Sequence, residues 1–184
     1  MNYLTKEVEW VIEELNNDGV ILYPTDTVYG LGCKIDNIGG IKRIHNIKGR
    51  DPSKPLSIAF YDIEQLEQYA DISKPEKRII SEKLIEGPYT FIVNKREGKI
   101  NELISKDGAV GVRIPDHYMV KMICKEAGPI ITTSANLSGA EAAVRLDDVV
   151  EEIIKKVDII LIGECKYERP STILDIRSLK ILRE

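Results

Sequence analysis

Short apolar segments alternate with helix-period stretches along nearly the whole chain, and this alternation constrains the fold most. Apolar runs of four to eight residues bounded by turn residues are typical of buried strands. Stretches in which apolar residues recur every three or four positions are typical of helices that pack one face against a sheet. A chain that interleaves the two patterns favours an α/β fold with helices flanking a sheet.

Six stretches have helical spacing and eight short runs have strand character. The expected helices cover residues 5–17, 38–47, 63–69, 76–85, 119–127 and 149–157. The expected strands cover residues 20–23, 56–60, 87–94, 108–114, 130–134, 159–162, 171–176 and 179–182. The turn between the last two strands is so short that they are expected to form an antiparallel pair, so the sheet should be mixed. No repeat or linker divides the chain, which predicts a single domain over residues 1–184.

Composition limits the class of protein. With 43% hydrophobic and 30% charged residues, the chain has the composition of a soluble globular protein, and no apolar run approaches the roughly 20 residues of a transmembrane helix. The N-terminal segment MNYLTKEVEW has no uninterrupted apolar stretch of the kind found in secretory signals, so we expect a cytoplasmic protein without membrane association.

Charge and cysteine content exclude further classes. A formal net charge of −4 argues against a surface devoted to nucleic acid, although a local basic cleft stays open. The three cysteines are far apart and form no C-x-x-C pair, so they are interpreted as structural thiols rather than metal ligands. The chain contains no G-x-x-x-x-G-K-[ST] loop and no G-x-G-x-x-G fingerprint, so a nucleotide would have to be bound by dispersed residues.

Polar residues gather at the ends of expected strands, where ligands of open α/β sheets tend to bind. The segment YPTDTVYGLGC places Thr25 and Thr27 directly after the first strand. The segment KGR carries two cations, Lys48 and Arg50, which suit a polyphosphate as a point charge and a planar fork. Solvated surface charges are the simpler interpretation of these two residues taken alone.

Three further segments have two readings each. ITTSANLSG concentrates Thr132, Ser134 and Asn136 at one strand end, where they would either bind a ligand or satisfy their own backbone in a turn. Arg113 ends another strand, where a buried guanidinium needs either a bound anion or a structural carboxylate. Ser171 and Thr172 point to opposite faces of their strand, so only one of them can serve a given site.

Five segments in the order YPTDTVYGLGC, KGRDPSKPLSI, VGVRIPDH, ITTSANLSG and PSTILDI resemble the YrdC/TsaC family, the L-threonylcarbamoyladenylate synthases. The resemblance extends from about residue 20 to the C-terminus. It includes the K-x-R and S-x-N pair that marks the synthases in that family, here Lys48-Gly49-Arg50 and Ser134-Ala135-Asn136.

The resemblance implies a fold and an activity. The fold would be a twisted, mixed parallel and antiparallel sheet flanked by helices, with a positively charged concave face that binds the ligands. The reaction would combine L-threonine, bicarbonate and ATP, with Mg²⁺ bound through the ATP phosphates, into threonylcarbamoyl-AMP and pyrophosphate. A tRNA threonylcarbamoyl transferase complex would then take over the product for tRNA modification. An RNA-binding module of the same fold, holding tRNA or double-stranded RNA without synthase activity, is the alternative.

The resemblance also implies roles for single residues. Lys48 and Arg50 would be the catalytic, phosphate-binding cations, and Lys48 is expected to be a loop residue with little packing to lose. ATP binding would involve both of them together with Ser134, Asn136 and Arg145, although the loop GAEAAVR before and including Arg145 departs from the proline-containing loop of many members. The residues expected to bind threonine are Arg113, on its carboxylate, and Thr25, Thr27, Thr132 and Thr172.

Overall fold

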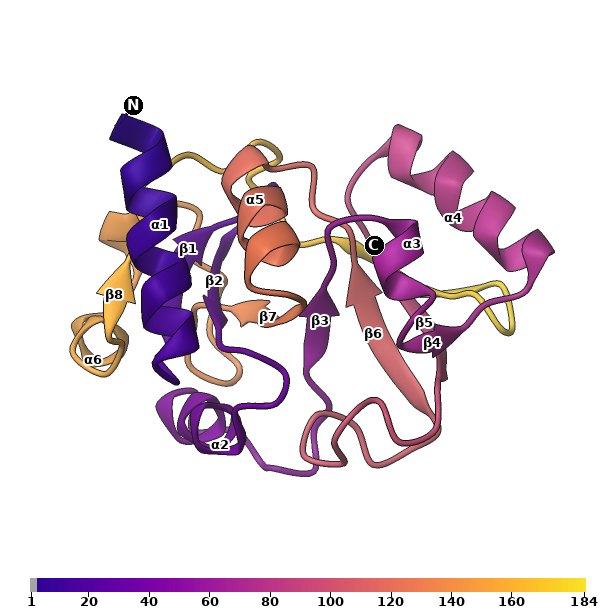
Figure 1. Ribbon diagram of the computed structural model, residues 1–184, viewed down its shortest axis with the longest axis horizontal. Helices are drawn as coiled ribbons and strands as arrows, with labels where there is room; N and C mark the ends of the chain where they lie inside the picture. Colours follow the sequence, from indigo (N-terminus) through magenta and orange to yellow (C-terminus); the bar gives the residue numbers. More distant parts are fainter. Residues whose placement is uncertain (1–2) are drawn as a thin grey trace.

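The structure is a computed structural model that describes residues 3–184. Residues 1 and 2, which begin the segment interpreted above as lacking a secretory signal, lie outside this range. Within the described residues the strands form one ten-stranded sheet in the order β10-β9-β5-β6-β3-β7-β2-β1-β8, with β4 paired to β5 (Figure 1). Its strands are β1 Ile21–Pro24, β2 Tyr29–Gly32, β3 Ser57–Ala59, β4 Ala70–Asp71, β5 Tyr89–Lys95, β6 Ala109–Arg113, β7 Ile130–Ser134, β8 Ile159–Ile160, β9 Thr172–Asp175 and β10 Lys180–Arg183.

The sheet is mixed, as the sequence predicts. The pairs β1–β8, β3–β6 and β5–β9 are parallel, and the other neighbours are antiparallel. The last two strands form the expected antiparallel pair. Helices flank the sheet: α1 Tyr3–Asn16, α2 Ile38–Ile47, α3 Ile63–Leu66, α4 Lys74–Glu86, α5 Tyr118–Glu126 and α6 Glu151–Ile154, with a 3₁₀ helix η1 at Leu146–Asp148. None of the helices in the described part of the chain is long and apolar enough to cross a lipid bilayer.

Two apolar clusters hold the layers together. In one cluster, α1 and α5 lie side by side (Figure 1) and bury residues such as Leu15 and Val120 against Tyr23 of β1. In the larger cluster, Ile44 of α2 packs with strand residues that include Leu31 and Ile58. Three of the isoleucines that recur at helical spacing in α2, Ile41, Ile44 and Ile47, are therefore core residues, whereas Ile38 in the first turn is exposed.

The structure differs from the sequence prediction at four elements, of which the first is the two-residue strand β4, too short to give a pattern in the sequence. Strand β2 was not predicted, because the glycines in its sequence YGLG lack strand propensity and the strand is fixed by its neighbours β1 and β7. The helix expected over residues 149–157 shortens to the four-residue α6, because Val149 and Val150 have extended backbone angles and separate α6 from the preceding η1. The strand expected over residues 159–162 shortens to β8, a strand at the edge of the sheet that pairs only with β1.

Candidate active site

A row of small residues crosses the middle of the sheet and leaves room for a cleft. Ser57 of β3 lies opposite Gly111 of β6 on one side and Thr132 of β7 on the other. A Cβ atom added at Gly111 would come within 2.8 Å of the Ser57 Oγ, so glycine keeps this floor open. The resulting cleft has a volume of about 760 Å³, within the usual range of small-molecule sites.

The walls of the cleft come from strand ends and loops that are distant in the sequence. Its polar and charged lining residues are Thr25, Thr27, Arg50, Ser57, Thr90, Arg113, Thr132, Thr133, Ser134, Asn136, Glu141, Glu168, Ser171 and Arg183. The charged side chains of this list are three arginines and two glutamates, and one of the arginines, Arg113, is paired with a buried aspartate. Seven of the residues proposed from the sequence are therefore brought together: Thr25, Thr27, Arg50, Arg113, Thr132, Ser134 and Asn136.

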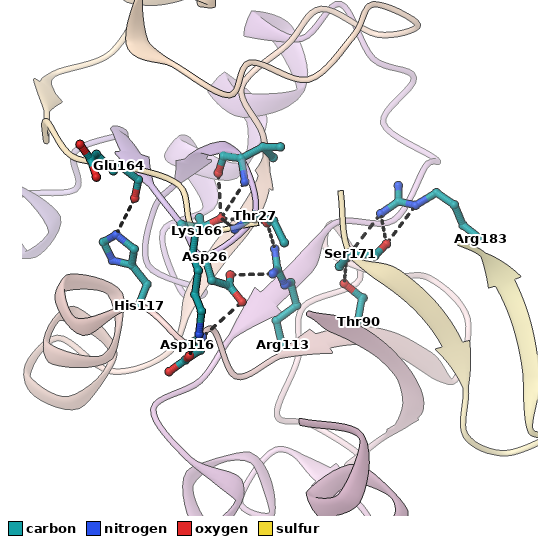
Figure 2. A network of polar contacts seen from close by, with 12 residues as sticks. Asp26, Thr27, Thr90, Arg113, Asp116, His117, Glu164, Lys166, Ser171 and Arg183 are labelled. Carbon is teal, nitrogen blue, oxygen red and sulfur yellow. Dashed lines mark hydrogen bonds and ion pairs between the residues drawn. The ribbon is translucent and has the colours of Figure 1, made fainter. Parts of the chain in front are cut away.

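Arg113 is held by a carboxylate of the chain itself (Figure 2). Its Nη2 donates to Asp26 Oδ1 at 2.7 Å, and its Nη1 donates to Thr27 Oγ1 at 2.8 Å. The second carboxylate oxygen of Asp26 accepts the Asp116 backbone N–H at 3.2 Å. The pair is buried, with side-chain exposures of 9% for Arg113 and 4% for Asp26. Of the two partners that the sequence analysis considered for Arg113, a bound anion or a structural carboxylate, the structural carboxylate is present, and it is Asp26.

The two threonines that flank Asp26 complete this cluster. Thr25 Oγ1 donates to the Val28 carbonyl at 2.7 Å, lies 2.9 Å from Thr27 Oγ1 and accepts the Thr27 and Val28 N–H groups. The Thr25 hydroxyl therefore satisfies backbone groups of the turn after β1, and it positions the Thr27 hydroxyl, which accepts from Arg113. Both residues line the cleft, but their hydrogen-bonding capacity is partly used within the protein.

Lys48 lies beneath the cleft rather than in it. It is 3% exposed, and its Nζ donates to the carbonyls of Ser134 and Asn136 and to Asn136 Oδ1, the last two at 2.9 and 3.1 Å. Burial, and after it the nearby Arg50 guanidinium, lower the pKa of Lys48 to about 8. The expectation of a loop lysine with little packing to lose was wrong, because Lys48 is the C-cap residue of α2 and its side chain points inward.

Gly49 closes α2 and directs the next residue into the cleft. Its φ of +56° is in the left-handed region, its N–H donates to Asn46 O, and the Arg50 N–H donates to His45 O, which together form a Schellman motif. Arg50 is half-buried, donates to the Pro55 carbonyl at 3.1 Å and has a pKa lowered by burial. The glycine of KGR is therefore a helix-terminating residue that places Arg50.

Arg183 is a cleft residue that the sequence analysis missed. A bulge in β10 sets Ile181 opposite Leu174 but Arg183 opposite Ile173, and Ile173 lines the cleft. The extra residue turns Arg183 toward that face, which alternation along a regular strand would not do. Its guanidinium donates to the Ser171 carbonyl at 2.8 Å, and Ser171 Oγ lies 2.7 Å from Thr90 Oγ1 (Figure 2). Burial, followed by the charge of Arg113, lowers the pKa of Arg183.

Besides Lys48, two further proposed site residues lie outside the lining. The cleft is lined by Ser171 and Ile173, whereas Thr172 lies opposite Tyr89 on the other face of the strand, so Ser171 replaces Thr172 as the candidate. Arg145 is exposed at the start of η1, and its backbone N–H donates to Asp148 Oδ2 at 3.0 Å. The preceding loop, which includes Ala140 and Val144, reaches the cleft instead of Arg145.

The remaining candidates for chemistry are inert or absent from the cleft. All three cysteines are free and buried, and burial raises the pKa of each thiol. Within residues 3–184, no three His, Cys, Asp or Glu side chains cluster as a metal site would require. The cleft can therefore bind and orient an anionic ligand through arginines, hydroxyls and amides.

A mixed, open sheet with a cleft of hydroxyls and arginines at its strand ends defines the class: an α/β protein with a polar cleft of small-molecule size. A family model for the Sua5, YciO and YrdC proteins, described as "Telomere recombination", matches residues 13–184. The chain belongs to this Sua5/YciO/YrdC family.

Individual relatives agree with this assignment. The chain is 38% identical over 178 residues to a protein of Methanocaldococcus jannaschii named "Putative threonylcarbamoyl-AMP synthase", covering 96% of this chain and 84% of the relative. It superposes on E. coli YciO with a TM-score of 0.86 at 26% identity, covering 97% and 89% of the two chains. It also matches P. abyssi Sua5, solved in complex with L-threonine, with a TM-score of 0.83 at 30% identity. That match covers 91% of this chain but only 50% of the Sua5 chain, so this chain spans about half of that protein.

Proposed function

We propose that the chain is a synthase that makes L-threonylcarbamoyladenylate and pyrophosphate from L-threonine, bicarbonate and ATP. This would be the first step of tRNA threonylcarbamoyladenosine modification. The observation that carries the proposal is that one cleft contains two sets of polar groups. The first set is Arg113 with several hydroxyls, and the second is Arg50 with the S-x-N segment. The first set suits an amino acid and the second suits a phosphorylated nucleotide.

The amino-acid end of the cleft would be built around Arg113. A guanidinium has five N–H donors, and Asp26 and Thr27 occupy two of them, so donors remain for a ligand carboxylate. Thr132 and Ser171 add hydroxyls beside it, and the Thr25 and Thr27 hydroxyls stand behind it. The L-threonine complex of P. abyssi Sua5, a relative with the same fold, supports threonine as the ligand.

The nucleotide end would use Arg50, Arg183, Ser134 and Asn136. A guanidinium can donate two parallel N–H groups to a pair of phosphate oxygens, and Arg50 is half-buried in the cleft, which strengthens its attraction for anions. Ser134 and Asn136 line the same region and offer a hydroxyl and an amide. Mg²⁺ would enter on the ATP phosphates and neutralise part of their charge. Glu141 and Glu168 are the carboxylates that line the cleft. The proposal assigns neither of them, nor another residue of the chain, as a ligand of the ion.

The proposed reaction needs no covalent intermediate with the protein. The threonine amine adds to bicarbonate with loss of water, giving an N-carboxylate. One oxygen of this carboxylate attacks the α-phosphorus of ATP, the bond from that phosphorus to the bridging oxygen breaks, and pyrophosphate leaves with the electron pair. Arg50 and Arg183 would stabilise the charge that develops on the phosphates, while Arg113 would hold the carboxylate of threonine in line.

The experiment is to incubate the protein with ATP, Mg²⁺, bicarbonate and labelled threonine, and to follow pyrophosphate and labelled adenylate. The proposal expects both products, and expects both to vanish when threonine or bicarbonate is left out. Pyrophosphate release that does not depend on threonine would contradict it. We further propose that the reaction takes place in the cytoplasm and that the adenylate passes to a tRNA-modifying transferase complex.

A further inference from the structure

We propose that Lys48 is a positioning residue that acts through Asn136, and not a ligand of the ATP phosphates. Its ammonium would hold the Asn136 amide in one orientation, so that the amide presents an N–H group and not its oxygen toward the cleft. The inference rests on the proposed function only for the identity of the ligand, an adenine nucleotide. The contacts that support it lie entirely within the chain.

The first support is that hydrogen bonds within the protein use all three hydrogens of the Lys48 ammonium group. Lys48 Nζ has three hydrogens, and it contacts three acceptors: the Ser134 carbonyl, the Asn136 carbonyl and Asn136 Oδ1. Lys48 is buried and is absent from the residues that line the cleft, whereas Ser134 and Asn136 belong to them. A phosphate contact would require the ammonium to leave three acceptors, two of them backbone carbonyls, without their donor, which is costly in a buried place.

The second support is the orientation of the Asn136 side chain. Its Oδ1 accepts from Lys48 Nζ at 3.1 Å and from Ser134 Oγ at 2.5 Å, while its Nδ2 donates to the Ala140 carbonyl at 2.6 Å. An ammonium can only donate, so it excludes the flipped amide, in which Nδ2 would face Nζ. One Nδ2 hydrogen is used by Ala140, and the other stays available for an acceptor in the cleft.

The third support is a backbone connection between the two motifs. The Lys48 carbonyl accepts the Ser138 N–H at 2.8 Å, while Lys48 itself caps α2 beside the Schellman motif at Gly49. The K-x-R turn and the S-x-N loop are thus joined by the side chain and by the main chain of the same residue. Arg50 is the member of K-x-R that enters the cleft, so the two cations have different tasks.

A double-mutant cycle measured by calorimetry tests the proposal. Lys48→Met removes the ammonium and keeps most of the side-chain volume, and it should weaken ATP binding about 10- to 100-fold, the effect of losing the hydrogen bond that the oriented Asn136 amide donates to a charged ligand. Asn136→Ala should give a comparable loss. Because Lys48 acts through Asn136, the double variant should bind ATP no more weakly than Asn136→Ala alone. The matched control is Arg50→Ala with Asn136→Ala, whose losses should multiply.

The number of phosphates distinguishes the two roles further. A positioning residue for the S-x-N loop should lower the affinities for AMP and ATP by the same factor. A phosphate ligand should matter more for ATP than for AMP, as we expect for Arg50→Ala. Multiplicative losses for Lys48→Met and Asn136→Ala, or a loss confined to ATP, would overturn the proposal.

A ligand-free measurement separates this inference from the proposed function. The Asn136 side-chain amide signals can be assigned in ¹⁵N spectra by their absence in Asn136→Ala. They should shift and exchange faster with solvent in Lys48→Met, and stay unchanged in Arg50→Ala. Unchanged signals in Lys48→Met would refute the positioning role even if ATP binds, and a wild-type protein that binds no ATP would refute the proposed function alone.

A second variant covers the case in which Lys48→Met does not fold. Lys48→Arg keeps the positive charge but carries a planar fork that cannot direct hydrogens to the same three acceptors. It should still shift the Asn136 amide signals and weaken both AMP and ATP. Wild-type amide signals and wild-type nucleotide affinity in Lys48→Arg would contradict the proposal, because a generic cation would then be enough.

Discussion

Arg113 is already paired with a carboxylate of the protein, so a ligand that enters the cleft does not meet a free positive charge at this residue. Asp26 neutralises the guanidinium at 2.7 Å, so a bound carboxylate would share an arginine and not pair with a free one. The advantage of such an arrangement is order: the pair and Thr27 fix the plane of the guanidinium before any ligand arrives. Its cost is dependence on Asp26, since a buried guanidinium without its partner is strongly unfavourable.

The first prediction concerns this dependence. Asp26→Ala should lower the free energy of unfolding by about 3–5 kcal/mol, because it leaves the buried Arg113 uncompensated. Asp26→Asn should lower it less, since the amide oxygen can still accept from Nη2. Urea denaturation followed by circular dichroism would measure both. Asp116→Ala is the control: its exposed ion pair with Lys166 should be worth at most about 1 kcal/mol. Equal losses for Asp26→Ala and Asp116→Ala would contradict the prediction.

The second prediction separates two adjacent hydroxyls. Ser171 is buried, lines the cleft and lies 2.7 Å from the Thr90 hydroxyl, whereas Thr172 lies outside the cleft lining. Ser171→Ala should therefore weaken threonine binding about 5- to 10-fold, the usual effect of losing one neutral hydrogen bond. Thr172→Ser, which keeps a hydroxyl at its site, and Thr172→Ala should both leave the affinity unchanged. Calorimetry with threonine is the measurement. A loss of threonine affinity in Thr172→Ala but not in Ser171→Ala would contradict the prediction and place the threonine-binding hydroxyl on the other face of the strand.

At the scale of elements, the end of α2 and the bulge of β10 decide which cations enter the cleft. The helix end turns the chain between Lys48 and Arg50, so that one cation points inward and the other lines the cleft. The bulge does the same for Arg183 by adding one residue to the edge strand. Neither device uses an unusual side chain, and both depend on local backbone geometry.

The third prediction tests the turn at Gly49. Its φ of +56° costs an alanine about 1–2 kcal/mol, although an added Cβ would meet no atom within 4 Å. Gly49→Ala should therefore destabilise the protein by that amount and weaken ATP binding, since Arg50 loses its direction. Gly49→Asn should recover part of the stability, because asparagine tolerates left-handed angles. Gly108→Ala serves as control, since its Cβ also meets no atom within 4 Å and no left-handed angle is required there. Thermal unfolding of the set would decide it, and an equal effect at Gly108 would exclude the backbone explanation.

At the scale of the whole molecule, two histidines, the buried His45 and the half-buried His117, link folding to pH. His45 of α2 is buried against the 101–105 loop, where its Nε2 lies 3.4 Å from the Leu103 carbonyl. Burial is the main cause that lowers the pKa of His45, and burial likewise lowers the pKa of His117. The unfolded chain therefore binds more protons than the folded protein at pH values near and below the ordinary histidine pKa of about 6.5.

The fourth prediction follows from that sign. The stability contributed by neutral His45 is present above about pH 6.5 and is lost as the pH falls below it. His45→Gln, which cannot titrate, should show a smaller loss of unfolding free energy between pH 7.5 and pH 5.5 than the wild type, while His117 maintains the rest of the slope. Urea denaturation at the two pH values would measure the difference. An identical slope in both proteins would mean that His45 is not protonated on unfolding in this range.

Much of the fold could be read from the sequence because it depends on local patterns. The spacing of Ile38, Ile41, Ile44 and Ile47 predicted α2, and apolar runs between turn residues predicted seven of the strands at nearly their observed positions. Strand β2 escaped because its glycines carry no local signal, and its pairing with β7 joins residues about a hundred positions apart. The hydroxyl-rich segments were likewise recognisable, and the cleft does form where Thr25 follows β1 and where Thr132 and Ser134 lie in β7.

The sequence by itself determined the α/β class, the order of most elements and the family, since each depends on residue types at short spacing. Tertiary structure alone decided which polar groups are free to act. It paired Arg113 with Asp26 across 87 residues, turned Lys48 toward Asn136 across 88 residues, and exchanged Thr172 for Ser171 in the cleft. It also brought Arg183 into the cleft through a bulge. The physical reason is that hydrogen bonds and ion pairs between distant segments depend on where the folded backbone places them, and no local pattern of residues contains that position.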